Sequence, residues 1–399
     1  MAIYFFFDNL MTMTKEYLSY DDIAIVPAVT TSISHREECD PYRWTGYLPI
    51  FASCMDTVVS MENISEFNKN GISVVVPRGI SFEQRFDYFA HDDGGYTREN
   101  FVAFSLDESE RIFFDDEAGY NEIVEKVLFQ KNPKFQRHPL RICIDLANGH
   151  MERLLNLVKM IRKLYSSKDV SIMTGNIANP ETYREYEEAG VDFVRVGIGG
   201  GSGCLTSSNT GVHMPYYTLL SEMMQIKKSI NGKCKIIADG NIRGYADIQK
   251  ALTTSDYVMI GSLFNKAMES AGKTTFGNFY WNISGKRILR PIKTLLNRGK
   301  EVPKDKYEEV YKGVKRGVVD VYKQFYGQST KIAQKKSGNK VLKTAEGIVK
   351  YNKVEYDLAG WVKNETDYLR SAMSYTNSKT LDEFQNAEVI KITQRRFNL

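Results

Sequence analysis

Two kinds of segment alternate along most of the chain. Short runs of consecutive apolar residues, typical of strands buried on both faces, are separated by longer segments with apolar residues at helical spacing. The predicted strands are Leu48–Cys54, Ile72–Pro77, Phe101–Leu106, Arg141–Leu146, Val170–Gly175, Phe193–Gly197, Lys235–Gly240 and Tyr257–Ser262. The predicted helices are Glu62–Asn70, Phe82–Phe89, Glu117–Phe129, Met151–Leu164, Glu181–Ala189, Tyr216–Ile230 and Gly244–Leu252. Eight strands alternating with helices predict an α/β fold, a closed (β/α)8 TIM barrel.

The regular pattern ends after the eighth strand. Residues 273–324 form an aromatic and basic insertion with thirteen Lys and Arg against five Asp and Glu. Within it, Lys306–Tyr322 has the spacing of a solvated helix. Residues 325–353 are rich in Gly, Lys and Ser and are predicted to form a mobile flap or hairpin, followed by a closing helix, Asn364–Tyr375, and a short strand, Glu388–Thr393. We therefore expect one TIM-barrel domain over residues 1–399, enlarged after strand eight.

Composition narrows the class of protein. The chain is 42% hydrophobic and 26% charged, and its formal net charge of +4 is too small to indicate nucleic-acid binding. The five cysteines form no CxxC pair, which favours a reducing compartment such as the cytoplasm. No apolar run approaches eighteen residues, so no membrane span is expected.

The strongest candidate for chemistry is the loop Val194–Pro215, VRVGIGGGSGCLTSSNTGVHMP, because active sites of TIM barrels lie on the loops that follow the strands. Five glycines between Gly197 and Gly203 let the backbone approach a phosphate. Cys204, directly after them, is a candidate nucleophile. A buried and inert cysteine is the alternative that the loop alone leaves open.

Two more loops at the same end of the barrel have sequences that indicate phosphate binding. Asp239-Gly240 and Gly261-Ser262 follow strands seven and eight, where TIM barrels often bind phosphate through backbone N–H groups. Taken singly, each pair is also a good turn former. Their occurrence after the last two strands together predicts phosphate binding.

Ten segments, in order along nearly the whole chain, resemble the IMP dehydrogenase / GMP reductase family. They are YDDIAIVP (20–27), MDTV (55–58), DLANGH (145–150), MTGNI (173–177), VGIGGGSGCLT (196–206), TGVHMP (210–215), IADGNIR (237–243), MIGS (259–262), FYGQST (325–330) and TAEG (344–347). Residues 273–324 are much longer than their usual counterpart. The resemblance implies the same barrel fold and a purine nucleotide as substrate.

The resemblance also implies roles for individual residues. Cys204 would add to purine C2, with Thr206, Glu346, Asp145 and Arg78 as the other catalytic residues. The ribose and 5′-phosphate would be held by Ser202, Asp239, Gly240, Gly261, Ser262 and Tyr326, and the base by Gln328 and Ser329. Asp145 and Asn148 would bind the nicotinamide cofactor, and the backbone carbonyls of Gly199, Gly201 and Cys204 a monovalent cation such as K⁺.

Within the family, the sequence is closer to the reductases. The twenty residues from Gly327 through Glu346 contain no arginine, whereas dehydrogenases use an Arg-Tyr pair in a longer flap to activate water. TAEG places Glu346 where reductases keep a glutamate. The resemblance therefore implies NADPH-dependent reductive deamination of GMP, or a related 2-aminopurine nucleotide, to IMP through a covalent Cys204 thioimidate, in a cytoplasmic homotetramer of purine salvage.

Two alternatives stay open. One is oxidation at purine C2 with NAD, as in IMP dehydrogenases. The other is a non-catalytic nucleotide-binding or RNA-binding protein that uses the basic segment 273–324.

Eight positions depart from the pattern of the family: Arg78, Gly200, Gly203, Leu205, His213, Tyr216, Asn241 and Gln328. Arg78 stands where reductases carry a lysine, and arginine is a poor proton donor but a good clamp for a carboxylate. Gly200 replaces a bulkier residue and Tyr216 a glutamine, both close to the phosphate loops. Gln328 stands where relatives have a methionine beside the base, which predicts a change in the purine that is accepted.

Overall fold

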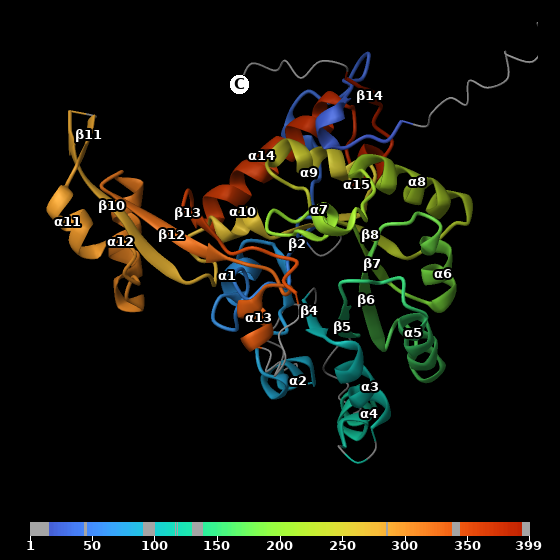
Figure 1. Cartoon of the computed structure of the whole chain (residues 1–399). Coiled ribbons are helices and arrows are strands. Elements are labelled where there is room, and N and C mark those ends of the chain that lie inside the picture. Colours follow the sequence, from blue (N-terminus) through green and yellow to red (C-terminus); the bar gives the residue numbers. More distant parts are fainter. Residues whose placement is uncertain are drawn as a thin grey trace, which may run out of the picture.

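The computed structural model describes residues 16–43, 46–90, 100–115, 117, 119–129, 139–284, 286–336 and 344–392. Eight parallel strands form a closed barrel in the order of the sequence, which confirms the predicted TIM barrel (Figure 1). Each predicted strand overlaps one barrel strand. The barrel strands are β2 (Ile50–Ala52), β3 (Ser73–Val76), β4 (Phe101–Phe104), β5 (Leu140–Asp145), β6 (Val170–Ile177), β7 (Phe193–Val196), β8 (Lys235–Asp239) and β9 (Tyr257–Ile260).

Aromatic rings fill one end of the barrel. Phe101, Phe193 and Tyr257 are the first residues of β4, β7 and β9, and their rings pack against each other and against Phe51, with centroids 5.1–6.2 Å apart. Such contacts between buried rings stabilise a core beyond the area that they bury. These four rings close the N-terminal end of the barrel. A ligand therefore has to enter from the opposite end, where the strands finish.

Helices surround the barrel where the apolar spacing predicts them. These are α1 (Ile64–Lys69), α2 (Phe82–Ala90), α4 (Tyr120–Phe129), α5 (Glu152–Leu164), α6 (Thr182–Ala189), α8 (Tyr216–Ser229) and α9 (Tyr245–Leu252). The structure adds α3 (Leu106–Phe114), which begins in a capping box: Ser105 Oγ accepts from the N–H of Glu108, and the Glu108 carboxylate accepts from the N–H of Ser105. Two short helices, α7 (Thr206–Thr210) and α10 (Ser262–Asn265), follow β7 and β9.

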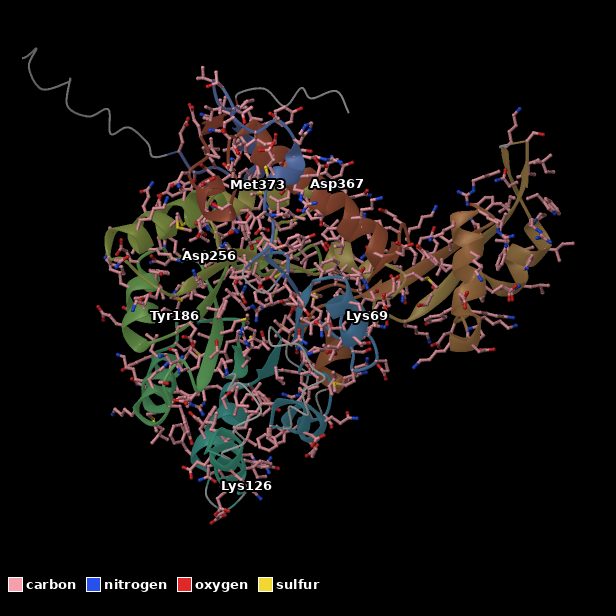
Figure 2. The ribbon with its side chains drawn as sticks, turned by 180° about the vertical axis from the view of Figure 1, so that it is seen from behind. Lys69, Lys126, Tyr186, Asp256, Asp367 and Met373 are labelled. Atoms are coloured by element: carbon pink, nitrogen blue, oxygen red, sulfur yellow. The ribbon has the colours of Figure 1, made fainter. Side chains whose placement is uncertain are left out.

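Residues 274–325 form an arm that stands away from the barrel in both views (Figures 1 and 2). Its sheet has the order β11-β10-β12-β13, from β10 (Thr274–Ile283), β11 (Lys286–Leu289), β12 (Val319–Phe325) and the returning strand β13 (Lys350–Lys353). Helices α11 (Pro291–Asn297) and α12 (Tyr307–Lys315) pack on this sheet. The arm has its own apolar cluster, formed by Met268, Phe279, Val302, Val319, Val321 and Val354.

The helix predicted over Lys306–Tyr322 is correct only in its first half. Helix α12 ends at Lys315, and Gly317 turns the chain with a left-handed φ of +68°. Val319 and Val321 then lie on β12, both buried in the arm's cluster. The β-branched residues after Gly317 favour the strand, and they outweigh the helical spacing.

Lys323 lies buried at the base of the arm, with 1% of its surface exposed, and donates from Nζ to the Ser270 carbonyl at 2.5 Å. Burial lowers its pKa from 10.5 to about 8, against the attraction of Glu269. Between these two pH values the folded chain binds fewer protons than the unfolded chain, so the free energy of unfolding rises with pH. We expect a rise of roughly 3 kcal/mol between pH 8 and pH 10.5.

Urea unfolding of wild type, Lys323→Met and Lys304→Met across this pH range tests the expectation. Lys304 is an exposed lysine of the same arm, so its variant should keep the rise. The Lys323→Met variant should lose it. The same pH dependence in all three proteins would show that Lys323 is charged in the folded arm.

The C-terminal segments return to the barrel. Helix α14 (Leu358–Tyr375) begins earlier than predicted, because the Asp357 carboxylate caps it by accepting from the N–H of Gly360 at 2.6 Å. Helix α15 (Leu381–Phe384) follows, and strand β14 (Val389–Lys391) pairs with β1 (Ile23–Ile25).

The segment predicted as a flap carries α13 (Lys331–Lys336) and β13, and its residues 337–343 lie outside the described part, as does residue 393 of the predicted last strand. Among the described helices, none combines the length and the apolar character that a bilayer span requires.

Candidate active site

A cavity of about 400 Å³ opens at the C-terminal ends of the barrel strands, a size that suits a small-molecule ligand. Its wall comes from the loops after β2, β3, β5, β6, β7, β8 and β9 and from the segment that follows β12. The sequence-predicted residues on this wall are Arg78, Asp145, Gly199, Gly201, Ser202, Cys204, Thr206, Asp239, Gly240, Gly261, Ser262, Gln328, Ser329 and Glu346.

Three of these side chains form a hydrogen-bonded chain. The Cys204 thiol lies 3.3 Å from Thr206 Oγ1 and donates to it, and Thr206 Oγ1 in turn donates to Glu346 Oε2 at 2.7 Å. Cys204 is partly exposed at the cavity, whereas Cys39, Cys54, Cys143 and Cys234 are buried. This chain connects a thiol to a carboxylate through one hydroxyl, which is the arrangement that moves a proton between them.

Backbone hydrogen bonds bring Glu346 to the cysteine loop across 140 residues of sequence. The N–H of Leu205 donates to the Glu346 carbonyl at 2.7 Å, and the N–H of Ile348 donates to the Gly203 carbonyl at 2.9 Å. Lys350 Nζ also donates to the Ser202 carbonyl. The position of the carboxylate is therefore fixed by the loop that carries the thiol.

Asp145, at the end of β5, is held by two guanidinium groups. Arg78 donates from Nε to Oδ2 at 3.0 Å, and Arg195 donates from Nη1 to Oδ1 at 2.5 Å. Burial alone would raise the pKa of this carboxyl, but the charges of Arg195 and Arg78 outweigh it and lower the pKa. Asp145 is thus a fixed, ionised acceptor, and Arg78 clamps it, as the chemistry of arginine predicts.

Arg195 is a site residue that the sequence analysis did not identify. From β7 it reaches both Asp145 and Asp239, where its Nε lies 2.9 Å from Oδ2, and Asn176 Nδ2 donates to the same oxygen at 2.8 Å. The guanidinium is buried. The sequence did contain a signal for this residue, because Arg195 is the one charged residue in the apolar strand FVRV. A buried charge requires a partner, so an acidic group nearby could have been expected.

We expect Arg195→Gln to lower the free energy of unfolding by about 3–5 kcal/mol, because the partly buried Asp239 then has no ion-pair partner among the described residues and the buried Asp145 keeps only Arg78. Arg195→Lys should recover part of this loss. Urea unfolding measures both variants against Arg184→Gln, which removes an exposed ion pair with Glu181 and should change stability by about 1 kcal/mol or less. If Arg195→Gln and Arg184→Gln lowered the free energy of unfolding equally, the ion pairs of Arg195 with Asp145 and Asp239 would not stabilise the barrel.

The loops after β7 and β8, which the sequence predicts to bind phosphate, are packed around one tyrosine. A Cβ atom on Gly200 would lie 2.2 Å from Tyr216 Oη, and one on Gly240 would lie 2.7 Å from it. Tyr216 donates from Oη to the Asp239 carbonyl at 3.1 Å. The ring of Tyr216 therefore fills the space that a side chain at position 200 would need. Both positions are among those expected to differ from the family's pattern.

Asn241 joins the same two loops. Its N–H donates to the Gly200 carbonyl at 2.9 Å, and its φ of +57° lies in the left-handed region that asparagine tolerates better than most residues. The loops after β7 and β8 are thereby connected directly.

Two predicted residues do not reach the cavity wall. Tyr326 is buried under Lys336, whose Nζ lies 5.5 Å from the ring centroid. Asn148 lies on an exposed turn and accepts from the N–H of His150 at 3.0 Å. The wall also contains Asn176 and Met55, for which no role was predicted.

In the part of the chain that the structure describes, no group of three or more His, Cys, Asp or Glu side chains is arranged to hold a metal ion. The predicted cation ligands are backbone carbonyls. Gly199 O accepts from Ser207 Oγ at 3.1 Å, and Gly201 O accepts from the N–H of Cys204 at 2.9 Å. Each carbonyl keeps a second lone pair, so both still fit a monovalent cation.

Residues 139–320 match the family described as "IMP dehydrogenase / GMP reductase domain". A GMP reductase of Exiguobacterium is 30% identical over 268 residues, which cover 64% of this chain and 72% of the relative. The chain belongs to the IMP dehydrogenase / GMP reductase family. Members of the family that are similar over a longer range include the GMP reductase of Oceanobacillus iheyensis, 27% identical over 96% of this chain and 98% of the relative, and that of Caenorhabditis elegans, 27% identical over 88% and 83%.

Membership in this family confirms the resemblance seen in the sequence motifs. GMP reductases are oxidoreductases, so the predicted enzyme class is confirmed too.

Proposed function

We propose that this protein is an NADPH-dependent GMP reductase, which converts GMP to IMP and ammonia through a covalent intermediate on Cys204. The observation that carries the proposal is the hydrogen-bonded chain from Cys204 through Thr206 to Glu346 on the wall of the cavity. Releasing ammonia requires a proton donor close to the thiol. Hydrolysing the intermediate, as a dehydrogenase does, instead requires an activated water.

The hydrogen-bonded chain supplies the proton balance of the first half-reaction. The thiol proton moves to Thr206 Oγ1, whose own proton moves to Glu346, so that a thiolate is free to attack C2 of the purine. Glu346 then returns this proton through Thr206 to the 2-amino group, the C2–N bond breaks, and ammonia leaves. The product of this half-reaction is the Cys204 thioimidate.

In the second half-reaction, a bound NADPH would supply the hydride to C2, and cleavage of the C–S bond would restore Cys204 as a thiolate. The cavity wall fits a nicotinamide group, because Arg78 uses only its Nε on Asp145 and its two Nη groups have no partner among the described residues. These donors suit a carboxamide oxygen. Asp145 would hold the guanidinium in place.

Asp239 would bind the ribose. Arg195 and Asn176 both donate to Oδ2, so Oδ1 keeps its lone pairs for a ribose hydroxyl. Backbone groups at Gly240 and Gly261, with the hydroxyls of Ser202 and Ser262, would bind the 5′-phosphate on the adjacent wall.

Gln328 supports a purine with an oxygen at position 6. Its Nε2 is buried at the cavity and has no hydrogen-bond partner in the described part of the chain. An unsatisfied buried donor is unfavourable by about 1–3 kcal/mol, which an acceptor on the substrate would relieve. The 6-oxo group of GMP is such an acceptor, whereas a 6-amino group is a donor.

Three further assignments complete the proposal. The carbonyls of Gly199, Gly201 and Cys204 would hold K⁺, and replacing K⁺ by Li⁺ in the assay should lower activity. The enzyme would be a homotetramer, which light scattering measures directly. It would act in the cytoplasm, in the salvage of purine nucleotides.

Absorbance at 340 nm tests the activity. GMP with NADPH should give a decrease in absorbance together with one ammonia per cofactor oxidised. Turnover of IMP with NAD, and none of GMP with NADPH, would instead show an IMP dehydrogenase.

A further inference from the structure

The end of the arm carries an apolar surface that no part of the described chain covers. Of the twenty large hydrophobic residues exposed in the described part of the chain, seven lie between positions 281 and 296. They are Trp281, Ile283, Ile288, Leu289, Ile292, Leu295 and Leu296, with 46–83% of their surface exposed. Exposed apolar groups concentrated in this way mark an interaction surface.

Helix α11 is oriented with its apolar stripe away from its own sheet. Ile292, Leu295 and Leu296 have the i, i+3, i+4 spacing of one helix face and are 62–83% exposed. Thr294, on the opposite face, is buried and accepts from the N–H of Phe279 in β10. The polar residue therefore attaches the helix to the sheet, and the apolar residues project into solvent.

The hairpin of β10 and β11 extends this surface. Trp281 pairs with Ile288 and Ile283 with Lys286, so these four side chains lie on one face of the hairpin. Phe279 shares that face by its even spacing from Trp281, and α11 is bonded to Phe279. We call Trp281, Ile283, Ile288, Ile292, Leu295 and Leu296 the apolar tip, and β11 and α11 lie at the end of the arm farthest from the barrel (Figure 1).

Basic residues predominate in the segment that carries the apolar tip. Residues 273–300 contain seven Lys and Arg and no Asp or Glu. Lys273 and Arg287 form ion pairs with Glu301 and Asp320. The other five have no ion-pair partner among the described residues: Lys286, Arg290, Lys293, Arg298 and Lys300.

We propose that the apolar tip inserts into the surface of an anionic lipid membrane. Aliphatic side chains and a tryptophan enter the boundary between head groups and acyl chains, while lysines and arginines at their edge attract anionic head groups. A single-stranded nucleic acid would neutralise the cations, but it leaves Ile292, Leu295 and Leu296 in water. Docking of the same face on a second copy would bring like charges together.

Sedimentation of the full chain with vesicles tests the proposal. We expect binding to phosphatidylcholine vesicles that contain phosphatidylserine, little binding to pure phosphatidylcholine, and weakening by salt. The triple variant Ile292→Ser, Leu295→Ser, Leu296→Ser should bind at least tenfold more weakly. The variant Lys286→Gln, Lys293→Gln, Lys300→Gln should lose affinity by about fivefold for each cation removed.

A matched control lies on α5. Met160 and Leu164 are 45% and 56% exposed beside Lys159 and Lys163, so Met160→Ser with Leu164→Ser should leave vesicle binding unchanged. Reductase activity should be the same in all variants, because the apolar tip is remote from the cavity. Absence of binding to anionic vesicles overturns the proposal. The proposal is also overturned if the triple variant at Ile292, Leu295 and Leu296 has a smaller assembly mass in light scattering than wild type, or if the protein binds RNA and this variant still binds it.

Discussion

Cys204→Ala is expected to lower turnover of GMP by about five to six orders of magnitude, as removal of a nucleophile does in other covalent enzymes. GMP should still bind within a few fold of wild type, because the loops around Tyr216, which we propose bind the phosphate, do not depend on the thiol. Steady-state turnover and calorimetric titration with GMP measure the two effects separately. Full turnover in this variant would end the covalent mechanism.

Mass spectrometry gives an independent test of the same step. Wild type incubated with GMP in the absence of NADPH, and quenched in acid, should gain the mass of GMP minus ammonia on the peptide that contains Cys204. Cys39→Ala is the matched control, since Cys39 is a buried thiol away from the cavity. It should keep both the adduct and the activity.

Glu346→Gln should slow release of ammonia by roughly 10²–10⁴-fold, the usual contribution of a positioned acid or base. The amide cannot take the proton that Thr206 passes on, although its size and the backbone bonds from Leu205 and Ile348 are kept. Single-turnover release of ammonia measures the chemical step. Affinity for GMP should change little by comparison.

The control for Glu346 is Glu355→Gln. Glu355 follows β13 and forms a surface ion pair with Lys266, so its loss should leave ammonia release unchanged. Thr206→Val, which breaks the same hydrogen-bonded chain in the middle, should resemble Glu346→Gln. If Glu346→Gln weakened GMP binding as much as it slowed release, Glu346 would be a binding residue.

The barrel was predictable because its strands are buried on both faces. Segments such as SVVV in β3 and FVAF in β4 are apolar at nearly every position, which only a sheet covered on both sides requires. Helix α3 was missed although its capping box, Ser105 to Glu108, is present in the sequence. The box directly follows an apolar strand, and its first residues were assigned to that strand.

The candidate site was predictable where one loop supplies it, and less so where distant segments meet. Cys204 and Thr206 are neighbours in sequence, and their contact follows from the spacing. Arg195 was missed because its two partners, Asp145 and Asp239, end other strands of the barrel. The resemblance identified Glu346, but spacing within the chain gives no reason for it to meet Thr206.

The secondary structure of the arm was also hard to predict, because its strands pair with distant segments. Its strands β10 and β12 pair residues that lie forty or more positions apart. Helix α12 and strand β12 share a segment with apolar residues at helical spacing. Local periodicity does not decide between a helix and a strand when the strand's partner is that distant.

Strand β13 belongs to the arm's sheet through its pairing with β12, and it begins at Lys350. Ile348, two residues earlier, is bonded to the loop that carries Cys204. Only three residues separate Lys350 from Glu346, so a displacement of the arm's sheet would reach Glu346 through a short segment that is itself bonded to the cysteine loop.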